Sequence, residues 1–423
     1  MQNFQFYVPT KVVFGQGTVD QVGQLVAEQG CKKVLVHFGG RSAKASGLLD
    51  RVCASLQSAG VPYVTLGGVK PNPRLALVYE GLELCRKEGV DFLLAVGGGS
   101  VIDSAKAIAF GLANPDLDVW DLYDQHAAAT ACAPVGCVLT IAAAGSETSN
   151  SSVITKETPD GDLKRAYGSD LCRPRFAIMD PTLTYTLPDY QTACGCTDIM
   201  MHTMERFFAY EKDNDVTDNI AIGILRAVKK NALILVKDPK NYNARAQIMW
   251  AGSLSHNSLT GCGIVGRGDW ATHQLEHELG GMFDVANGAG LAAVWGSWAR
   301  YVYKTNPGRF AQFGKKVFGI NISSSTNITP NSDAPEQPIK PSPIITDPEL
   351  TSTDTAALAA ITAWETWCHS ISMPTTLTEL GIHPTDAQIE EMAEKCVFGR
   401  NGHVGFFQPL TKEDIAAILK MAK

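Results

Sequence analysis

The chain has 423 residues, enough for two domains with well-developed hydrophobic cores. Hydrophobic residues make up 45% of it and charged residues 19%, a composition that excludes wholesale disorder. The net charge of −7 excludes a protein that binds nucleic acid or an anionic membrane through a generally basic surface.

The cysteines and the N-terminus bear on where the protein works. Eleven cysteines are scattered irregularly, which favours reduced thiols over a disulfide framework. Residues 1–15 lack a basic segment followed by an apolar run, so they do not resemble a signal peptide. No stretch reaches the roughly 18 consecutive apolar residues that a transmembrane helix requires. We therefore expect a cytoplasmic protein that is not anchored in a membrane.

Strand and helix signals alternate in the first half of the chain. Repeated strand–glycine–helix units are typical of a parallel sheet covered by helices, so residues 1–190 are expected to form an α/β domain. Apolar runs predict strands at 11–14, 33–38, 63–66 and 92–96, and another that ends at Thr140.

The second half shows helical periodicity alone, and residues 191–423 are expected to form a helical domain. Within it, residues 320–352 are rich in Ser, Thr, Asn and Pro and have no period, which predicts a surface insertion or a partly disordered loop. Apolar residues recur at helical intervals over 196–210, 219–236, 243–258, 270–279, 288–304, 310–318, 353–370, 386–396 and 412–421.

A glycine-rich segment, Gly97-Gly98-Gly99-Ser100, follows a predicted buried strand and opens a predicted helix. Glycines let a diphosphate approach the backbone closely, and a helix N-terminus supplies N–H groups and a favourable dipole. We place Asp103 in the first turn of that helix, where it would complement the helix dipole and could also hold a ribose or nicotinamide group. The segment predicts a dinucleotide site, with a plain tight turn as the alternative. Residues 15–17 show a similar pattern without its third glycine, and we assign them to a turn.

A second glycine segment, Gly39-Gly40-Arg41-Ser42, ends the second predicted strand, where an adenosine ribose often lies. An acidic residue there would repel a 2′-phosphate, whereas Arg41, Ser42 and Lys44 would accept one. We therefore expect NADP(H) in preference to NAD(H). A solvated basic turn is the alternative.

Two pairs of potential metal ligands stand four residues apart: Asp198 with His202, and His273 with His277. At helical pitch, each pair lies on one face of a helix. A carboxylate and two or three imidazoles that converge from two helices can hold a transition metal. Either pair alone is also common on a helix surface. We expect the helix of the second pair to break at residues 280–281.

Several of these segments together resemble the iron-containing (group III) alcohol dehydrogenases, especially their butanol dehydrogenase-like branch. The resemblance covers nearly the whole chain except the insertion. It implies a dehydroquinate synthase-like fold, with a dinucleotide-binding N-terminal domain, a helical metal-binding C-terminal domain and a cleft between them. A homodimer or larger homo-oligomer is also implied. The segments that follow the family's order and spacing are 14–17, 39–42, 71–73, 97–106, 144–147, 180–181, 198–202 and 270–290.

The resemblance also implies which residues contact the cofactor, when it is carried over position by position. Those residues are Gly97, Gly98 and Ser100 for the diphosphate, Gly39, Gly40 and Ser42 for the adenosine end, Thr140 and Ser146 for the adenine and diphosphate region, Leu183 packed on the nucleotide, Lys164 toward the nicotinamide ribose, and Asn72 and Asp103.

The implied metal ligands are Asp198, His202, His273 and the position fourteen residues beyond His273. The family has histidine at that last position, whereas this chain has Asn287, whose amide oxygen is a weak, neutral ligand. Iron is the first expected metal, with zinc and manganese as alternatives. In the family His277 lies near the substrate, so it is our candidate to relay a proton or orient the substrate. A surface histidine is the alternative.

Together these observations predict an NAD(P)-dependent, metal-assisted alcohol dehydrogenase or aldehyde reductase. It would transfer hydride between the nicotinamide and a small aldehyde or primary alcohol. Two alternatives stay open. One is a lyase resembling the dehydroquinate synthases, which the apolar character of residues 275–285 disfavours. The other is a metal-deficient nucleotide-binding protein, which Asn287 suggests.

Overall fold

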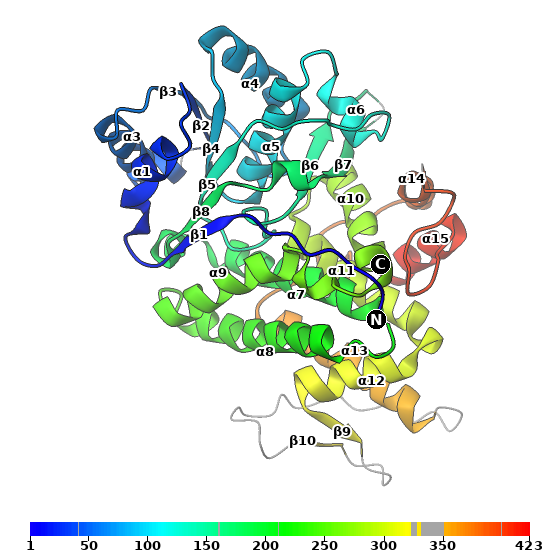
Figure 1. The fold of residues 1–423 in the computed structure, drawn as a ribbon. Helices are drawn as coiled ribbons and strands as arrows, with labels where there is room; N and C mark the ends of the chain where they lie inside the picture. Colours follow the sequence, from blue (N-terminus) through cyan, green and yellow to red (C-terminus); the bar gives the residue numbers. More distant parts are fainter. Residues whose placement is uncertain (41, 160, 210, 323–327, 331–350, 399) are drawn as a thin grey trace. The chain divides into compact units, whose positions relative to one another are not determined.

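The computed structural model describes residues 1–40, 42–159, 161–209, 211–322, 328–330, 351–398 and 400–423. They form two compact units, each assembled from separate stretches of chain (Figure 1). The α/β unit comprises Phe6–Gly195 and Asp238–Ser258. The helical unit comprises Met1–Gln5, Cys196–Lys237 and Leu259–Lys423.

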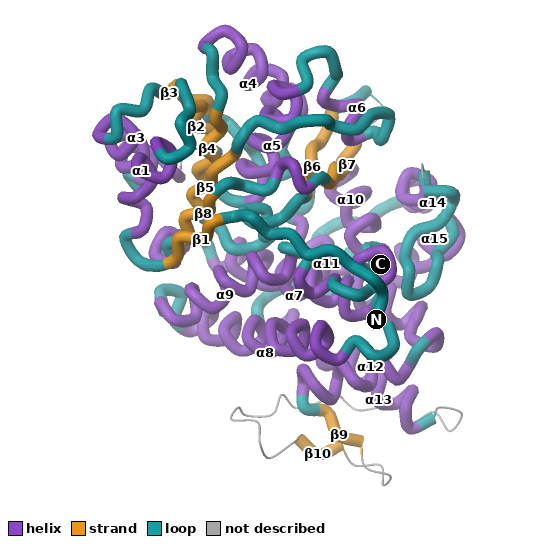
Figure 2. The backbone as a smooth tube through the Cα atoms, viewed as in Figure 1, coloured by secondary structure: helices purple, strands orange, loops and turns teal. Residues whose placement is uncertain are grey.

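A six-stranded sheet, in which every paired strand runs parallel, forms the centre of the α/β unit (Figure 2). Its order is β1-β8-β5-β4-β2-β3. The inner strands are buried along their whole length, as expected for a sheet that is covered on both faces. The strands are β1 (Lys11–Phe14), β2 (Val34–Phe38), β3 (Tyr63–Leu66), β4 (Phe92–Gly97), β5 (Val135–Leu139) and β8 (Phe176–Met179).

Successive side chains of a strand point to opposite faces of the sheet and pack into two separate hydrophobic cores. Leu93 and Ala95 pack with residues of α4 and α5, whereas Leu94 and Val96 pack with residues of α1 and α3. The prediction of a parallel sheet with flanking helices is confirmed. The helices after the first strands are α1 (Val22–Ala27), α2 (Ser42–Ala45), α3 (Leu48–Ser58), α4 (Leu75–Glu88), α5 (Gly99–Ala113) and α6 (Val119–Tyr123).

Several elements of the α/β unit were not predicted as parts of it. β6 (Ser151–Lys156) and β7 (Leu163–Gly168) form an antiparallel hairpin whose polar residues carry little strand signal, and β8 is only four residues long. Helix α9 (Tyr242–His256) comes from the second half of the chain, yet it groups with the sheet. The Ser253 hydroxyl of α9 donates a hydrogen bond to the buried Glu147 carboxylate. The expected continuous domains, 1–190 and 191–423, differ from the compact units chiefly in this helix.

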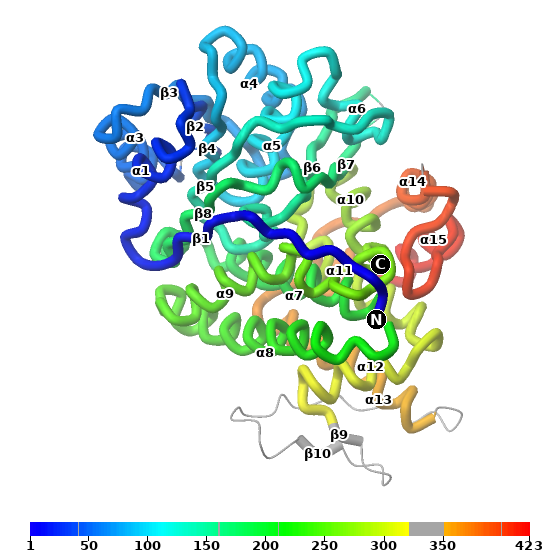
Figure 3. The backbone as a smooth tube through the Cα atoms, viewed as in Figure 1, coloured from blue at the N-terminus to red at the C-terminus, as the bar shows by residue number. Residues whose placement is uncertain are grey.

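The helical unit is packed around aromatic side chains such as Phe208, Trp295 and Phe310, and it also holds the first residues of the chain. Met1 donates to the Lys212 carbonyl at 3.0 Å, and Figure 3 shows the blue N-terminal end beside this later segment. The helices are α7 (Asp189–Phe208), which begins in the α/β unit, α8 (Asp215–Lys237), α10 (Ala271–Phe283), α11 (Asn287–Val302), α12 (Pro307–Phe313), α13 (Ser352–Ser370), α14 (Asp386–Val397) and α15 (Lys412–Met421).

The structure corrects two predictions about the helical half. Helix α10 does not break at residues 280–281 but continues to Phe283, because packing of the buried turn outweighs the low helix propensity of glycine. It ends where Asp284 adopts a left-handed φ of 51°. The half is also not purely helical, since β9 (Ile320–Ile322) and β10 (Ile328–Pro330) form a short antiparallel ladder. The rest of the predicted insertion before α13, residues 323–327 and 331–350, lies outside the described residues.

Short turns and the cysteines complete the description. None of the eleven cysteines forms a disulfide. Among the described residues, no helix combines the length and the apolar character needed to cross a bilayer. The short turns are the 3₁₀ segments Thr18–Gln21, Asp170–Cys172, Pro181–Thr184, Leu259–Gly261, Val265–Arg267 and Tyr303–Thr305, and a π turn at Gly314–Phe318.

Candidate metal centre and nucleotide site

The order of the strands reverses between β2 and β4. From β2 the chain continues to β3 on one side, whereas β4, β5 and β8 follow one another on the other side. Open α/β sheets bind ligands beyond the carboxyl ends of the strands at such a point. Gly39 and Gly40 follow β2, and Gly97 and Gly98 end β4 and cap α5. The structure therefore brings both predicted glycine segments to the switch point.

The three glycines at the start of α5 are required by close neighbours. A Cβ added at Gly97 would lie 2.4 Å from the Val101 side chain, and one at Gly99 would lie 2.8 Å from the Ala144 methyl group. At Gly98 the nearest Ile141 side-chain atoms would be 3.0 Å away. A side chain at any of these three positions would therefore crowd its neighbours.

Asp103 lies in the second turn of α5, not in the first turn as predicted. It is buried, and both of its carboxylate oxygens accept hydrogen bonds, one from the Ser146 hydroxyl and the other from the Val153 amide at 3.0 Å. This carboxylate therefore anchors the loop of Ser146 and the first strand of the hairpin. The helix-dipole role that we expected for it does not apply so far along the helix.

Lys106 is a buried residue of the same motif that sequence reasoning did not single out. Its ammonium group donates to the carbonyl oxygens of Ser146, Ser149 and Ser151 at 2.7, 3.0 and 2.8 Å. A fully buried cation needs such a set of acceptors. Lys106 thus fixes the loop that carries Ser146, and the available signal was a lysine within an otherwise apolar helix.

The remaining predicted cofactor residues lie on several elements of the α/β unit. The Thr140 amide donates to the Gly97 carbonyl at 3.0 Å, so it adjoins the glycine segment. Asn72 precedes Pro73, whose carbonyl accepts from the amide of Thr155, and Lys164 pairs with Thr155 across the hairpin. The others stand on their own elements: Ser100 in α5, Ser42 at the start of α2, and Leu183 in the Pro181–Thr184 turn beside the α1–α3 core. Arg41 lies outside the described residues.

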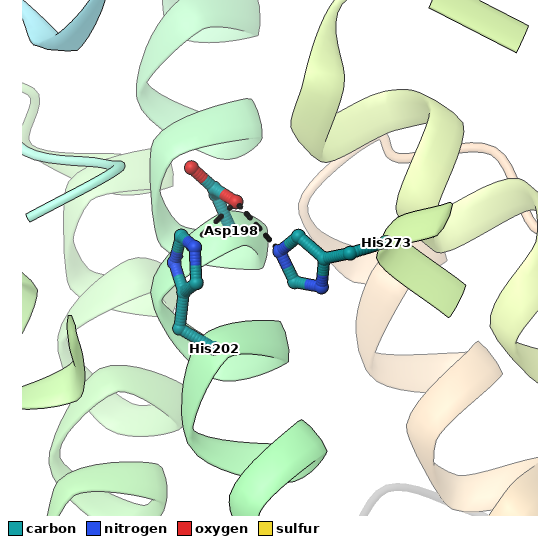
Figure 4. Close-up of side chains that lie close together, drawn as sticks. All are labelled: Asp198, His202 and His273. Carbon is teal, nitrogen blue, oxygen red and sulfur yellow. Dashed lines mark ion pairs between the residues drawn. The ribbon is translucent and has the colours of Figure 1, made fainter. Parts of the chain in front are cut away.

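In the helical unit, Asp198 and His202 of α7 converge with His273 of α10 (Figure 4). One ligand atom from each residue lies within 4.8 Å of the other two. The Asp198 Oδ1 atom is 3.6 Å from His202 Nδ1 and 3.8 Å from His273 Nε2. All three residues are buried. The donor atoms are too far apart for good hydrogen bonds but close enough to share one cation.

The environment of His273 tests whether these residues fit a metal ion. Its Nε2 atom is buried and has no hydrogen-bond partner among the described residues. Its Nδ1 atom lies 2.8 Å from Glu205 Oε1. A neutral imidazole that donates its Nδ1 proton to a carboxylate presents the Nε2 lone pair, which is how ligating histidines are commonly held. The carboxylate and the two imidazoles therefore fit a borderline divalent cation.

In the absence of a cation, the surrounding charges favour a protonated His273. Burial by itself lowers the pKa of this imidazole, but its interactions with the Asp198 and Glu205 carboxylates outweigh burial and raise the pKa to about 9. A metal ion must displace this proton when it binds.

Glu205 is the supporting residue that sequence reasoning missed. It lies three residues after His202 on α7, and that spacing next to a suspected ligand was the available signal. Near it, the carboxyl group of Asp269 accepts from the Phe406 and Phe407 amides at 2.7 and 2.6 Å. Burial, and then the negative charge of Glu205, raise the pKa of Asp269 to about 7.

Asn287 and His277 complete the predicted residues. Asn287 is the first residue of α11, and its Nδ2 atom donates to Asp198 Oδ1 at 2.8 Å. The NH2 group of the Asn side chain donates hydrogen bonds, so it is the group that faces a carboxylate. This nitrogen has no free lone pair and does not ligate a metal ion. His277 lies one turn beyond His273 and is 7% exposed. It is therefore not the surface histidine that we kept as an alternative.

Two family descriptions match this arrangement of sheet, glycine segment and ligand cluster. "Iron-containing alcohol dehydrogenase" matches residues 9–181, and "Fe-containing alcohol dehydrogenase family, C-terminal" matches residues 192–338. The chain belongs to the iron-containing alcohol dehydrogenase family. The predicted family and enzyme class are thereby confirmed.

This iron-containing alcohol dehydrogenase is similar to several relatives over 90% or more of its length. NADH-dependent butanol dehydrogenase A of Clostridium acetobutylicum is 36% identical and covers 99% of both chains. The NADPH-dependent aldehyde reductase of Escherichia coli is 34% identical and covers 90% of both. The solved structure of NADH-dependent butanol dehydrogenase A from Thermotoga maritima matches with a TM-score of 0.88 at 34% identity, over 100% of this chain and 99% of that one. The predicted fold class is confirmed.

Proposed function

We propose that this alcohol dehydrogenase is metal-assisted and interconverts small aldehydes and primary alcohols with a nicotinamide cofactor. The observation that carries the proposal is the convergence of Asp198, His202 and His273, with the Nε2 lone pair of His273 directed at no protein donor. The names of the relatives support the substrate class, since they include butanol dehydrogenases and an aldehyde reductase.

The residues of the chain have separable tasks in this reaction. Bound reduced nicotinamide supplies a hydride for the carbonyl carbon, and a bound divalent cation supplies the Lewis acidity that polarises the carbonyl oxygen. Asp198, His202 and His273 would hold the cation. The segment Gly97–Ser100 would hold the diphosphate against the N-terminus of α5.

His277 is our candidate for the proton that the product oxygen needs. It is buried one turn beyond His273 on the same helix, and the natural pKa of imidazole suits a proton donor near neutral pH. It would donate a proton to the oxygen or orient the substrate. Replacing His277 by Ala should lower kcat more than it lowers metal content. Unchanged turnover across the pH range would remove His277 from the mechanism.

For the cofactor we propose NADP(H) in preference to NAD(H). Ser42 and Lys44 follow β2, where the 2′-phosphate of NADP would lie, and an acidic residue is missing from the described part of this turn. The relatives include enzymes named for either cofactor, so the sequence of this turn carries the choice. The ratio of kcat/KM for NADPH and NADH measures it, and a ratio in favour of NADH would contradict the proposal.

For the metal we propose iron, with zinc or manganese as alternatives, held by three protein ligands. Asn287 stands where the family has its fourth metal ligand, and its NH2 group donates to Asp198. That Asn287 is a weak metal ligand remains a prediction. The second alternative, a nucleotide-binding protein that retains little metal, rests on Asn287 alone, and the relatives do not favour it. The lyase alternative has no such support, because the relatives reported above are dehydrogenases and reductases. We also keep the prediction of a homodimer or larger homo-oligomer.

One combined experiment tests the proposed function. The purified protein is analysed for metals and then assayed at 340 nm with NADPH or NADH and a panel of short aldehydes, before and after loading with Fe(II), Zn(II) or Mn(II). We expect cofactor consumption that increases with metal occupancy. A fully loaded protein that binds the cofactor but consumes none with any aldehyde would contradict the proposal and favour the nucleotide-binding alternative.

A further inference from the structure

One carboxylate beside the ligand cluster accepts an unusual number of hydrogen bonds. Glu205 Oε1 accepts from the His273 amide at 3.0 Å, from the His273 ring at 2.8 Å and from the Thr272 hydroxyl. Glu205 Oε2 accepts from the Trp270 amide at 2.7 Å. The side chain is buried, so these contacts are not weakened by water.

The same contacts cap α10, whose N-cap residue supplies no side-chain hydrogen bond. Trp270, at the N-cap position, has a left-handed φ of 65° and makes no side-chain cap hydrogen bond. Glu205 reaches across from α7 and accepts from amides at the first turn of α10 instead. A negative charge at this end is also favoured by the helix dipole. The start of α10 is thus fixed by a residue of the helix that carries Asp198 and His202.

The geometry points to Glu205 as a positioning residue of the metal centre, an inference that rests on the proposed function. By accepting from both the amide and the ring Nδ1 of His273, Glu205 fixes the ring's orientation and keeps the proton on Nδ1. The Nε2 lone pair is then presented toward Asp198 and His202. One carboxylate couples the ring of one ligand to the helix of the other two.

The alternative role for Glu205 is a helix cap with no influence on the metal. The two roles predict different effects on metal affinity when the Thr272 hydroxyl, rather than the Glu205 charge, is removed. Thr272 contacts the same carboxylate oxygen as the His273 ring but does not touch that ring in any described contact. Removing its hydrogen bond with Thr272→Val should therefore weaken the cap without freeing the imidazole. Glu205→Gln keeps the shape of the side chain but removes the charge that holds the ring.

The experiment measures Co(II) affinity by competition with a chelator in four proteins: wild type, Glu205→Gln, Thr272→Val and Asp198→Ala. Visible absorption of the Co(II) forms reports the coordination, and thermal unfolding of the metal-free forms reports the cap. NADPH binding shows that the α/β unit of each variant is folded, and a cooperative unfolding transition shows the same for the helical unit. We expect Glu205→Gln to bind Co(II) about 10- to 100-fold more weakly and with an altered spectrum, as is usual when an outer carboxylate of a ligating histidine is lost. Thr272→Val should lose thermal stability but keep Co(II) affinity within about threefold of the wild type, because the charge of Glu205 and its contact with the His273 ring stay in place.

Two outcomes overturn the inference while the proposed function survives. They are wild-type affinity and spectrum in Glu205→Gln, and equal losses of Co(II) affinity in Glu205→Gln and Thr272→Val. If instead wild type binds Co(II) no better than Asp198→Ala, the metal site itself is wrong and both proposals fail.

A second measurement needs no Glu205 variant and so covers the case in which Glu205→Gln does not fold. Wild type with ¹⁵N-labelled histidine is loaded with Zn(II), and the His273 signals are assigned by their loss in His273→Gln. The inference requires a protonated Nδ1 and a metal-bound Nε2. The opposite arrangement overturns it.

Discussion

The nucleotide segment and the metal centre are built in opposite ways. At the start of α5, three consecutive residues have no side chain, and close neighbours such as Val101 and Ala144 leave no room for one. At the metal centre, side chains from α7 and α10 converge, and Glu205 holds the ring of His273. A backbone site is specified by what is absent from a short stretch of sequence. A side-chain site is specified by distant residues that must meet.

The difference predicts how each site fails. A substitution at the glycine segment should affect cofactor binding alone, because its neighbours all belong to the α/β unit. A substitution at the ligand cluster should affect metal and turnover and leave cofactor binding intact. Four substitutions test this separation.

Asp198→Ala should have the largest effect. Asp198 Oδ1 is the atom that both imidazoles face, so its removal takes away the shared anionic ligand. We expect metal content near zero and kcat reduced on the order of a thousandfold, because the Lewis acid is lost. Elemental analysis and steady-state kinetics measure both. NADPH affinity should stay unchanged, and a parallel loss of NADPH binding would show that the two sites are not separable.

Gly98→Ala should weaken the cofactor and spare the metal. The new methyl group would lie 3.0 Å from Ile141 and on the backbone that we propose holds the diphosphate. We expect the Kd for NADPH to rise about 10- to 100-fold, equivalent to about 1.4–2.8 kcal/mol. Fluorescence titration with NADPH gives the value, and metal content is measured in parallel. Gly223→Ala is the matched control, because nothing lies within 4 Å of its added Cβ. Equal affinities in the two variants would remove Gly98 from the cofactor site.

Asn287→His should strengthen the metal centre. It exchanges an amide that donates to Asp198 for an imidazole that can contribute a fourth ligand. We expect metal affinity about tenfold or more above the wild type, and a higher kcat, since one good ligand contributes at least about 1.4 kcal/mol. Chelator competition and kinetics with added Fe(II) or Zn(II) test this. Equal affinity and rate in both proteins would mean that three ligands already suffice.

Asp269→Asn should give the smallest effect, visible only as a change in pH dependence. The pKa of Asp269 is raised to about 7, so the folded protein keeps a proton that the unfolded chain has lost. Its stabilising contribution is complete below the ordinary aspartate pKa of about 4 and is lost as the pH rises through about 7. When the pH is raised from about 5 to about 8, the urea concentration at the unfolding midpoint should therefore fall more for the wild type than for Asp269→Asn. Parallel pH profiles would contradict the assignment.

What could be predicted from the sequence follows the same contrast. The glycine segment and its strand could be predicted because all the required residues are contiguous and the apolar run of the strand ends sharply at Gly97. The ligands Asp198, His202 and His273 were legible as two spaced pairs on helices. The convergence of the pairs was available only through the resemblance, since no periodicity links α7 to α10.

The missed features are supports that only the folded chain brings into contact. Lys106 holds a loop forty residues away, and Glu205 holds His273 from another helix. The sequence carries only a weak signal for either residue, and it does not show which groups they contact. The predicted break in α10 failed for a related reason, because the buried packing of Gly280 outweighs the local preference of glycine. Asn287 was flagged as a departure from the family, but its contact with Asp198 required coordinates.

The placement of α9 has a consequence for how the chain is made. Synthesis proceeds from the N-terminus, and domains tend to fold as their last residues emerge. The sheet is complete by Met179, yet α9, with the Ser253 partner of Glu147, is translated only later, after α7 and α8. The α/β unit should therefore wait for residue 258 to leave the ribosome before it closes. A fragment ending at residue 195 would present a bare face where α9 belongs, and it should recruit chaperones or aggregate rather than bind nucleotide.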